Sequence, residues 1–169
     1  MTIAVKSLLL IAALALSACN NPDRYGAGGA GGAGGIDTTG LGDPSNPASI
    51  AYFNQSVGDR VLFQVDQSTL TPEARTVLAA QGQWLLKNAG YAAIIEGHAD
   101  EQGTREYNLA LGARRAAAVQ NFLISQGVPA NRLRTISYGK ERPLEVCSQE
   151  ACYAKNRRAV TVLSAGAGV

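Results

Sequence analysis

One polar segment, residues 97–108, holds most of the side chains that could bind or transform a small molecule. It offers the carboxylates of Asp100 and Glu101 and the hydroxyl of Thr104, and Arg115 follows further along the chain. A carboxylate accepts hydrogen bonds from an ammonium group, and a guanidinium binds a carboxylate through two parallel hydrogen bonds. If Asp100 and Arg115 flank a gap, they would therefore complement a zwitterion such as an amino-acid head group.

The direction of Arg115 follows from helical spacing. Arg114 and Arg115 are adjacent and point about 100° apart on a helix, so they cannot serve the same site. Leu111 lies four positions before Arg115 and shares its face, which predicts that Arg115 points inward and Arg114 toward solvent. A buried arginine needs an anion. Asp100 would meet that need either in a direct structural ion pair or across a ligand-binding gap.

Alternating strand and helix signals predict the elements that position this segment. The expected strands are residues 60–66, 91–97, 132–138 and 158–163, and the expected helices are 72–88 and 106–126. This βαβαββ order predicts an α+β fold, with a mixed sheet and both helices packed on one face. Trp84 and Phe122 are expected in the core. The polar segment would then connect the end of a buried strand to the start of a helix, where such folds often carry function.

The first residues have the pattern of an export signal. The apolar run Leu8 to Leu16 is shorter than the ~20 residues of a membrane-spanning helix. The tetrad from Leu16 to Cys19 resembles a bacterial lipobox, which predicts removal of residues 1–18 and attachment of N-acyl and S-diacylglycerol lipid to Cys19. Asn20, rather than an aspartate, resembles the signal of outer-membrane lipoproteins. We therefore expect an outer-membrane anchor with the folded domain in the periplasm.

Residues 19–51 are rich in glycine and poor in large apolar side chains, which predicts a flexible, disordered linker. A linker of this length has a root-mean-square span of roughly 30 Å. The single globular domain is expected over residues 52–165. The net charge of +2 is too small to indicate nucleic-acid binding.

The three cysteines have separate expected roles. Cys19 is assigned to lipid, which leaves Cys147 and Cys152 to form a disulfide in an oxidising compartment. A metal site at that pair would need further ligands, and the lone histidine, His98, lies far away in sequence. No metal ion and no other cofactor is expected.

Four motifs occur in one order, at residues 96–108, 111–119, 136–143 and 155–160. They read Glu-Gly-His-Ala-Asp-Glu-x-Gly-Thr-x-Glu-Tyr-Asn, Leu-Gly-x-Arg-Arg-Ala-x-Ala-Val, Ile-Ser-Tyr-Gly-Lys-Glu-x-Pro and Lys-Asn-Arg-Arg-Ala-Val. Together with the lipobox, they resemble the peptidoglycan-associated lipoproteins (Pal), members of the OmpA-like C-terminal domain superfamily. The resemblance covers about residues 57–163.

The resemblance implies non-covalent binding of peptidoglycan through meso-diaminopimelate, whose free end in the stem peptide is a zwitterion. It assigns the ligand-binding aspartate to Asp100 and the helix arginine to Arg115. The other implied pocket residues are Phe63, Thr104, Tyr107, Asn108, Leu111 and Arg158. Gln64 stands where many relatives have an aspartate, so no acidic contact is expected there, and Asp66 is expected to cap a turn.

The resemblance also implies partners: peptidoglycan, outer-membrane lipid, and TolB with the Tol complex, in envelope integrity and cell division. The competing hypothesis is a cell-wall hydrolase that uses His98, Asp100 and Glu101. A strand end would direct Glu101 away from the other two, and no serine or free thiol accompanies the histidine. A binding module rather than an enzyme is expected, with His98 as a hydrogen-bonded residue at the strand end.

Overall fold

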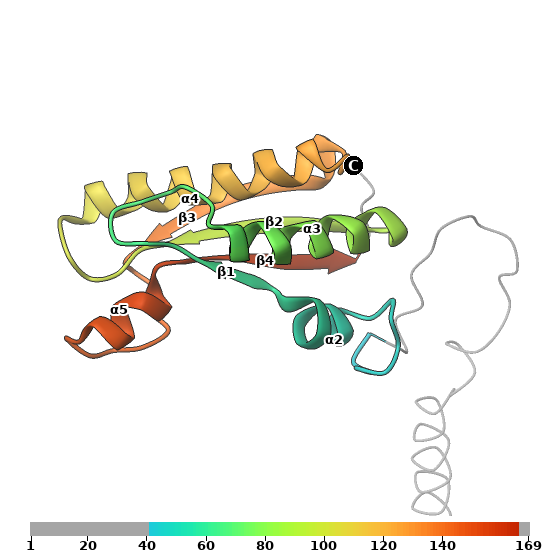
Figure 1. The fold of residues 1–169 in the computed structure, drawn as a ribbon, viewed down its shortest axis with the longest axis horizontal. Helices are drawn as coiled ribbons and strands as arrows, with labels where there is room; N and C mark the ends of the chain where they lie inside the picture. Colours follow the sequence, from blue (N-terminus) through green and yellow to red (C-terminus); the bar gives the residue numbers. More distant parts are fainter. Residues whose placement is uncertain (1–40, 166–169) are drawn as a thin grey trace, which may run out of the picture. The chain divides into compact units, whose positions relative to one another are not determined.

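The computed structural model describes residues 41–165, whose centre is a four-stranded mixed sheet (Figure 1). The strands are β1 (Arg60–Leu62), β2 (Tyr91–His98), β3 (Leu133–Gly139) and β4 (Arg158–Ala165), in the spatial order β1-β4-β2-β3. Strands β2 and β3 are parallel, whereas β4 runs antiparallel to β1 and to β2. The predicted mixed sheet is confirmed. The predicted signal peptide, Cys19 and the linker as far as residue 40 lie outside the described residues.

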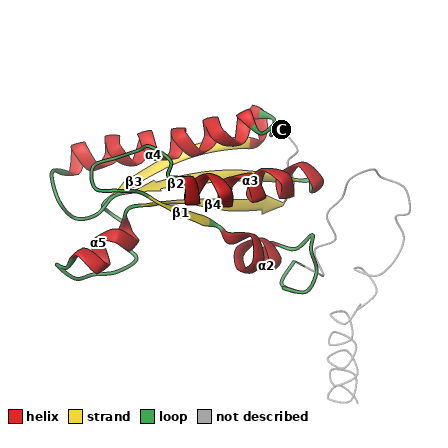
Figure 2. Ribbon diagram, viewed as in Figure 1, coloured by secondary structure: helices red, strands yellow, loops and turns green. Residues whose placement is uncertain are grey.

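The two long helices, α3 (Pro72–Lys87) and α4 (Arg105–Ser125), cover the same face of the sheet (Figure 2). Each begins at a threonine whose side-chain oxygen accepts a hydrogen bond from the first helical turn, Thr71 for α3 and Thr104 for α4. Along β2, alternate residues from Tyr91 to Gly97 are buried beneath the helices. Within residues 41–165, no helix combines the length and the apolar character needed to cross a membrane.

Helix α4 lies unusually close to β2 because two glycines face each other. A Cβ atom added to Gly97 would lie 1.9 Å from the carbonyl oxygen of Gly112, and one added to Gly112 would lie 2.4 Å from the Ser137 hydroxyl. Only glycine fits at this contact. The contact lies at the end of β2 that leads into the polar segment 99–104, so it places the start of α4 beside that segment.

The packed chain begins before residue 52, where the sequence analysis set the start of the domain. The indole nitrogen of Trp84 donates to the Pro47 carbonyl at 2.8 Å, and the Tyr91 hydroxyl donates to the Ala48 carbonyl at 2.9 Å. Buried indole and phenol groups need such acceptors. Residues from 41 onward therefore pack on the core and lead into α2 (Ile50–Tyr52) and a π-helix, η3 (Phe53–Gly58).

The first strand is shorter than predicted. The sequence indicates a strand over residues 60–66, but β1 ends at Leu62 and the chain then turns. The carbonyls of Gln64 and Gln67 accept hydrogen bonds from Arg115, so this backbone bonds a side chain rather than a neighbouring strand. Asp66 lies between them in the left-handed conformation, with φ of 57°.

Two short helices near β3 were not predicted. A 3-10 turn, η4 (Ala130–Arg132), precedes β3, and α5 (Glu150–Asn156) lies between β3 and β4. Helix α5 has no apolar stripe, since Asn156 is its one buried residue, so helical periodicity could not indicate it. Just ahead of the helix, Cys147 is bonded to Cys152 in a disulfide.

Candidate functional site

A cavity of about 240 Å³ lies where the turn after β1, the segment after β2 and the first turns of α4 meet. Its lining residues are Val65, Asp66, Asp100, Gln102, Gly103, Tyr107, Asn108 and Leu111. Four of them, Asp100, Tyr107, Asn108 and Leu111, are among the predicted site residues. The cavity therefore coincides with the polar segment that the sequence singled out.

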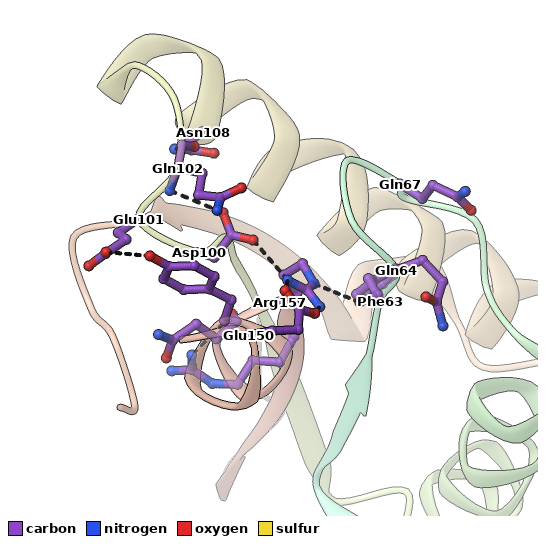
Figure 3. A network of polar contacts seen from close by, with 12 residues as sticks. Phe63, Gln64, Gln67, Asp100, Glu101, Gln102, Asn108, Glu150 and Arg157 are labelled. Carbon is purple, nitrogen blue, oxygen red and sulfur yellow. Dashed lines mark hydrogen bonds and ion pairs between the residues drawn. The ribbon is translucent and has the colours of Figure 1, made fainter. Parts of the chain in front are cut away.

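Asp100 provides a buried carboxylate at the cavity wall and is only 8% exposed. One of its oxygens lies 3.1 Å from Nη1 of Arg157, and the other accepts a hydrogen bond from the Gln102 amide at 3.2 Å. Figure 3 shows Arg157 between Asp100 and the backbone at Phe63. The direct ion partner of Asp100 is thus Arg157. Within residues 41–165, Asp100 forms no salt bridge with Arg115.

Arg115 is fully buried, as its inward spacing predicts, and it is not one of the residues that line the cavity. Its guanidinium donates to three backbone carbonyls: Gln67 at 2.8 Å, His98 at 2.8 Å and Gln64 at 3.1 Å. It also lies over the Phe63 ring, 5.1 Å from the centroid. Three of the five guanidinium N–H groups are therefore engaged within residues 41–165. Arg114 is exposed and lies over the Tyr107 ring instead.

The charge on Arg115 is maintained although burial disfavours it. Loss of hydration lowers the pKa of Arg115 to about 10, while the charges of Asp100 and Asp66 act in the opposite direction. A group with this pKa remains protonated at neutral pH. A fixed positive charge thus interacts with Asp100 and Asp66, the two carboxylates of the cavity lining.

Asp66 is a second carboxylate at the cavity, which the sequence analysis missed. It accepts a hydrogen bond from the Tyr107 hydroxyl, and this bond raises the pKa of Tyr107. Aspartate tolerates the left-handed backbone that Asp66 adopts better than most residues do. That tolerance, in a turn just after a strand, was the one local signal for its position.

Two of the predicted residues, Thr104 and Phe63, shape the site from outside the lining. Thr104 caps α4, so it holds the helix N-terminus beside the cavity, and Phe63 supports the Arg115 guanidinium. Asn108 lines the cavity and also holds the segment before α4, because it donates to the Gln102 carbonyl at 2.7 Å. Gly103 lies between Gln102 and Thr104, and its φ of 92°, in the left-handed region, allows the chain to turn there.

Arg158 does not reach this site. Its guanidinium donates to the Asn156 and Arg142 carbonyls, at 3.4 Å and 3.2 Å. The preceding residue, Arg157, contacts Asp100 instead, because adjacent residues at the start of a strand face opposite sides. Two consecutive arginines cannot be told apart by residue type alone, and in the structure Arg157 is the member of the pair that contacts the lining residue Asp100.

His98 faces the side of the sheet opposite the cavity, and its predicted hydrogen bond is wrong. In the structure of residues 41–165, neither ring nitrogen has a hydrogen-bond partner, although the ring is only 1% exposed. The ring packs against Tyr138, with 5.6 Å between the centroids. Burial, followed by the charges of Arg158 and Arg142, lowers the pKa of His98 to about 4.

The side chains of the hydrolase hypothesis have separate partners. Asp100 pairs with Arg157, whereas Glu101 accepts hydrogen bonds from the Tyr153 hydroxyl at 2.8 Å and the Ser148 hydroxyl at 3.2 Å. His98 lies on the other face of the sheet. Among residues 41–165, no group of three histidine, cysteine, aspartate or glutamate side chains is arranged to hold a metal ion.

Comparison with known proteins points to one class. The profile of the OmpA family matches residues 62–157. The chain resembles the crystal structure of the peptidoglycan-associated lipoprotein from Burkholderia pseudomallei, with a TM-score of 0.65 and 34% identity, over 70% of this chain and all of that one. The C-terminal domain of Helicobacter pylori MotB, at 22% identity and a TM-score of 0.59, shares the fold over 63% of this chain and 84% of its own. The domain is thus OmpA-like.

Relatives over nearly the whole length narrow this class. The peptidoglycan-associated lipoprotein of Mesorhizobium japonicum is 50% identical over 161 residues, covering 95% of this chain and 92% of the relative. That of Rhizobium meliloti is 49% identical over 164 residues, covering 95% and 88%. The chain therefore belongs to the OmpA family and, within it, to the peptidoglycan-associated lipoproteins. Its lipoprotein relatives indicate an envelope-associated protein.

Proposed function

We propose that this chain binds peptidoglycan non-covalently by taking the zwitterionic end of meso-diaminopimelate into the cavity at Asp100. The observation that carries the proposal is the buried carboxylate of Asp100 at the cavity wall, together with the buried guanidinium of Arg115, whose charge interacts with that carboxylate. Asp100 would accept the ligand ammonium. The ligand carboxylate would be stabilised by the cationic groups near the cavity and by the N-terminus of α4.

The site presents both signs of charge, which supports a zwitterionic ligand. Asp66 and Asp100 line the cavity with carboxylates, whereas Arg115 and Arg157 contribute guanidinium groups nearby. Glu150 offsets part of the charge of Arg157 from the solvent side. A zwitterion has one group for each sign of charge, whereas an ion with a single charge complements only one of them. The apolar stem of diaminopimelate would contact Val65 and Leu111, the aliphatic side chains of the lining.

The proposal extends to the whole envelope. Lipid on Cys19 would hold the chain in the outer membrane, residues 20–40 would cross part of the periplasm, and the domain would bind the cell wall. Two or more acyl chains make such an anchor effectively permanent. An interaction with TolB and the Tol complex during cell division forms part of the same proposal and is supported by the resemblance of the motifs.

Sedimentation with purified diaminopimelate-containing sacculi tests the cavity. Asp100→Asn keeps the shape of the side chain and removes its charge, and we expect a loss of affinity of about 30-fold or more, since a desolvated charged contact is worth ~2 to 5 kcal/mol. Free meso-diaminopimelate should compete with the sacculi for the unmodified chain. Glu73→Gln is the matched control, because Glu73 lies in the first turn of α3, away from the cavity.

Arg115→Lys tests the guanidinium separately. Lysine keeps the positive charge, but its three N–H donors share one nitrogen, whereas Arg115 reaches the three carbonyls through three separate nitrogens. We therefore expect binding to fall although the charge remains. The melting temperature of each variant shows whether the fold is retained. Sedimentation of a folded Asp100→Asn chain equal to that of the unmodified chain would refute this binding site.

A further inference from the structure

We propose that the loop closed by the Cys147–Cys152 disulfide is a positioning element of the cavity, which orients Asp100 for the ligand by holding Arg157 and the neighbouring Glu101. This inference rests on the proposed function. The loop lies outside the cavity lining, so its residues would act through the side chains that they hold. Two sets of contacts connect the disulfide-closed loop to the segment after β2.

The first set passes through Arg157. Glu150 lies between the two cysteines in sequence, and its carboxylate forms a salt bridge with the Arg157 guanidinium. The same guanidinium bonds Asp100 at 3.1 Å and, through Nε, the Phe63 carbonyl at 3.3 Å. Arg157 is 5% exposed, whereas Glu150 is 67% exposed. Glu150 therefore contacts the buried Arg157 from the solvent side, and Arg157 in turn contacts the cavity carboxylate of Asp100.

The second set reaches Glu101, the neighbour of Asp100. Ser148, which also lies between the cysteines, donates to Glu101 at 3.2 Å, and Tyr153 donates to the same oxygen at 2.8 Å. Lys140 adds a bond to the Gly103 carbonyl at 2.7 Å. The segment that carries Asp100 is thus held at three successive places by side chains from the connection between β3 and β4.

The loop has little apolar packing to hold it in place. Val146 is 85% exposed and Leu144 is 50% exposed, and α5 has seven residues of which only Asn156 is buried. A helix this short is not stable in isolation. Asn156 accepts from the amides of Leu144 and Glu145, which joins the end of α5 to the residues that precede the disulfide-closed loop. Since polar contacts supply the rest, the disulfide is the constraint that limits the loop to one conformation.

Such a constraint acts on affinity through preorganisation. With the disulfide formed, Glu101 and Arg157 are ordered before the ligand arrives. Without it, binding must order these side chains, and the entropy lost in doing so reduces the affinity. We expect the Cys147→Ser, Cys152→Ser double variant to bind sacculi about tenfold more weakly than the unmodified chain.

The experiment uses the full-length lipidated chain, extracted in detergent and sedimented with sacculi at several protein concentrations. Glu150→Gln should weaken binding, because it removes the charge that holds Arg157. Glu145→Gln is the matched control, since Glu145 lies in the same connection but pairs with Lys155 on the surface. Ser148→Thr keeps the hydroxyl and should bind like the unmodified chain, whereas Ser148→Ala should bind more weakly.

A thermodynamic cycle separates positioning from general stability. Tyr153→Phe removes one hydrogen bond to Glu101 and leaves the disulfide intact, so the loop should keep its conformation. If the disulfide acts by presenting Tyr153 and Ser148 to Glu101, Tyr153→Phe should weaken binding in the unmodified chain and have less effect in the chain without the disulfide. Equal affinities of the unmodified chain, the chain without the disulfide and the Tyr153→Phe chain would overturn the inference while leaving the proposed function intact. Failure of the unmodified chain to bind sacculi would overturn both.

Discussion

At the residue scale, the candidate site contains two buried arginines that bond different partners. Arg115 bonds backbone carbonyls and supplies charge near the cavity, whereas Arg157 pairs with Asp100 at the cavity wall. Both are buried, and a buried charge with imperfect partners is costly. The site therefore depends on the exact donors of each guanidinium as well as on their charge.

The contrast between Arg157 and Arg158 is testable by the same substitution in both. Arg157→Lys keeps one charge but cannot bond Asp100, Glu150 and the Phe63 carbonyl together, so we expect about tenfold weaker sedimentation with sacculi, in the range of a lost charged hydrogen bond. Arg158→Lys should leave sedimentation unchanged, because Arg158 bonds only two carbonyls away from the cavity. A larger effect at Arg158 would contradict this assignment.

His98, the only histidine in the chain, should make stability depend on pH. Its pKa is about 4 when folded and 6.5 when unfolded, so the unfolded chain binds more protons between these values. The free energy of unfolding should therefore fall as the pH falls from 6.5 to 4, by about 3 kcal/mol at ~1.4 kcal/mol for each pKa unit.

His98→Phe provides the measurement for this dependence. Phenylalanine keeps a ring against Tyr138 and does not titrate. Urea unfolding at several pH values should show that the difference in stability between the two chains changes across this window. Parallel stability curves for the two chains would show that His98 does not cause the dependence.

At the element scale, the contact between α4 and β2 decides where the site lies. Gly97 and Gly112 let the helix lie against the strand, and the cavity forms where both lead into the segment 99–104. Helix α3 and the aromatic cluster of Phe53, Trp84 and Tyr91 stabilise the opposite end of the domain. The mutual position of α4 and β2 therefore matters both for stability and for binding.

Gly97→Ala should push α4 away from β2 and so destabilise the fold. Its Cβ atom would lie 1.9 Å from the Gly112 carbonyl oxygen, and that backbone cannot yield without moving the helix. We expect a loss of about 3 kcal/mol in the free energy of unfolding, at the upper end for an overpacked core. Urea denaturation measures it. Gly42→Ala, whose Cβ would meet no atom within 4 Å, is the control and should change stability by less than about 0.5 kcal/mol.

At the scale of the whole molecule, the proposed function needs both ends of the chain. The domain would hold the cell wall, and lipid on Cys19 would hold the membrane, with the glycine-rich segment between them. Neither end alone would connect the two layers. The separation of the two tasks along the sequence is therefore part of the proposal.

Cys19→Ser should uncouple these tasks. Serine cannot form the thioether to diacylglycerol, so we expect the chain to leave the membrane fraction while the domain still sediments with sacculi. Cell fractionation and sacculus sedimentation measure the two properties on the same preparation. Loss of both properties in a folded chain would contradict independent ends, as would retention in the membrane fraction.

Local sequence was sufficient for the features that depend on neighbouring residues. Helical spacing predicts the inward face of Arg115 from Leu111, the cap at Thr71 predicts the start of α3, and runs of apolar and β-branched residues predict the strands. The polar segment around Asp100 is likewise recognisable from its own residue types. The tetrad at Cys19 is the same kind of signal, and its lipid remains a prediction.

Tertiary structure decided the features that depend on residues far apart in the chain. Asp100 and its partner Arg157 are 57 positions apart, and Arg115 bonds carbonyls 48 and 51 positions away, after a strand that ends earlier than its residue types indicate. Asp66 reaches the cavity through a left-handed turn. Sequence alone could identify the charged groups, because charge belongs to the residue, but only the packing of distant segments determines which charges meet.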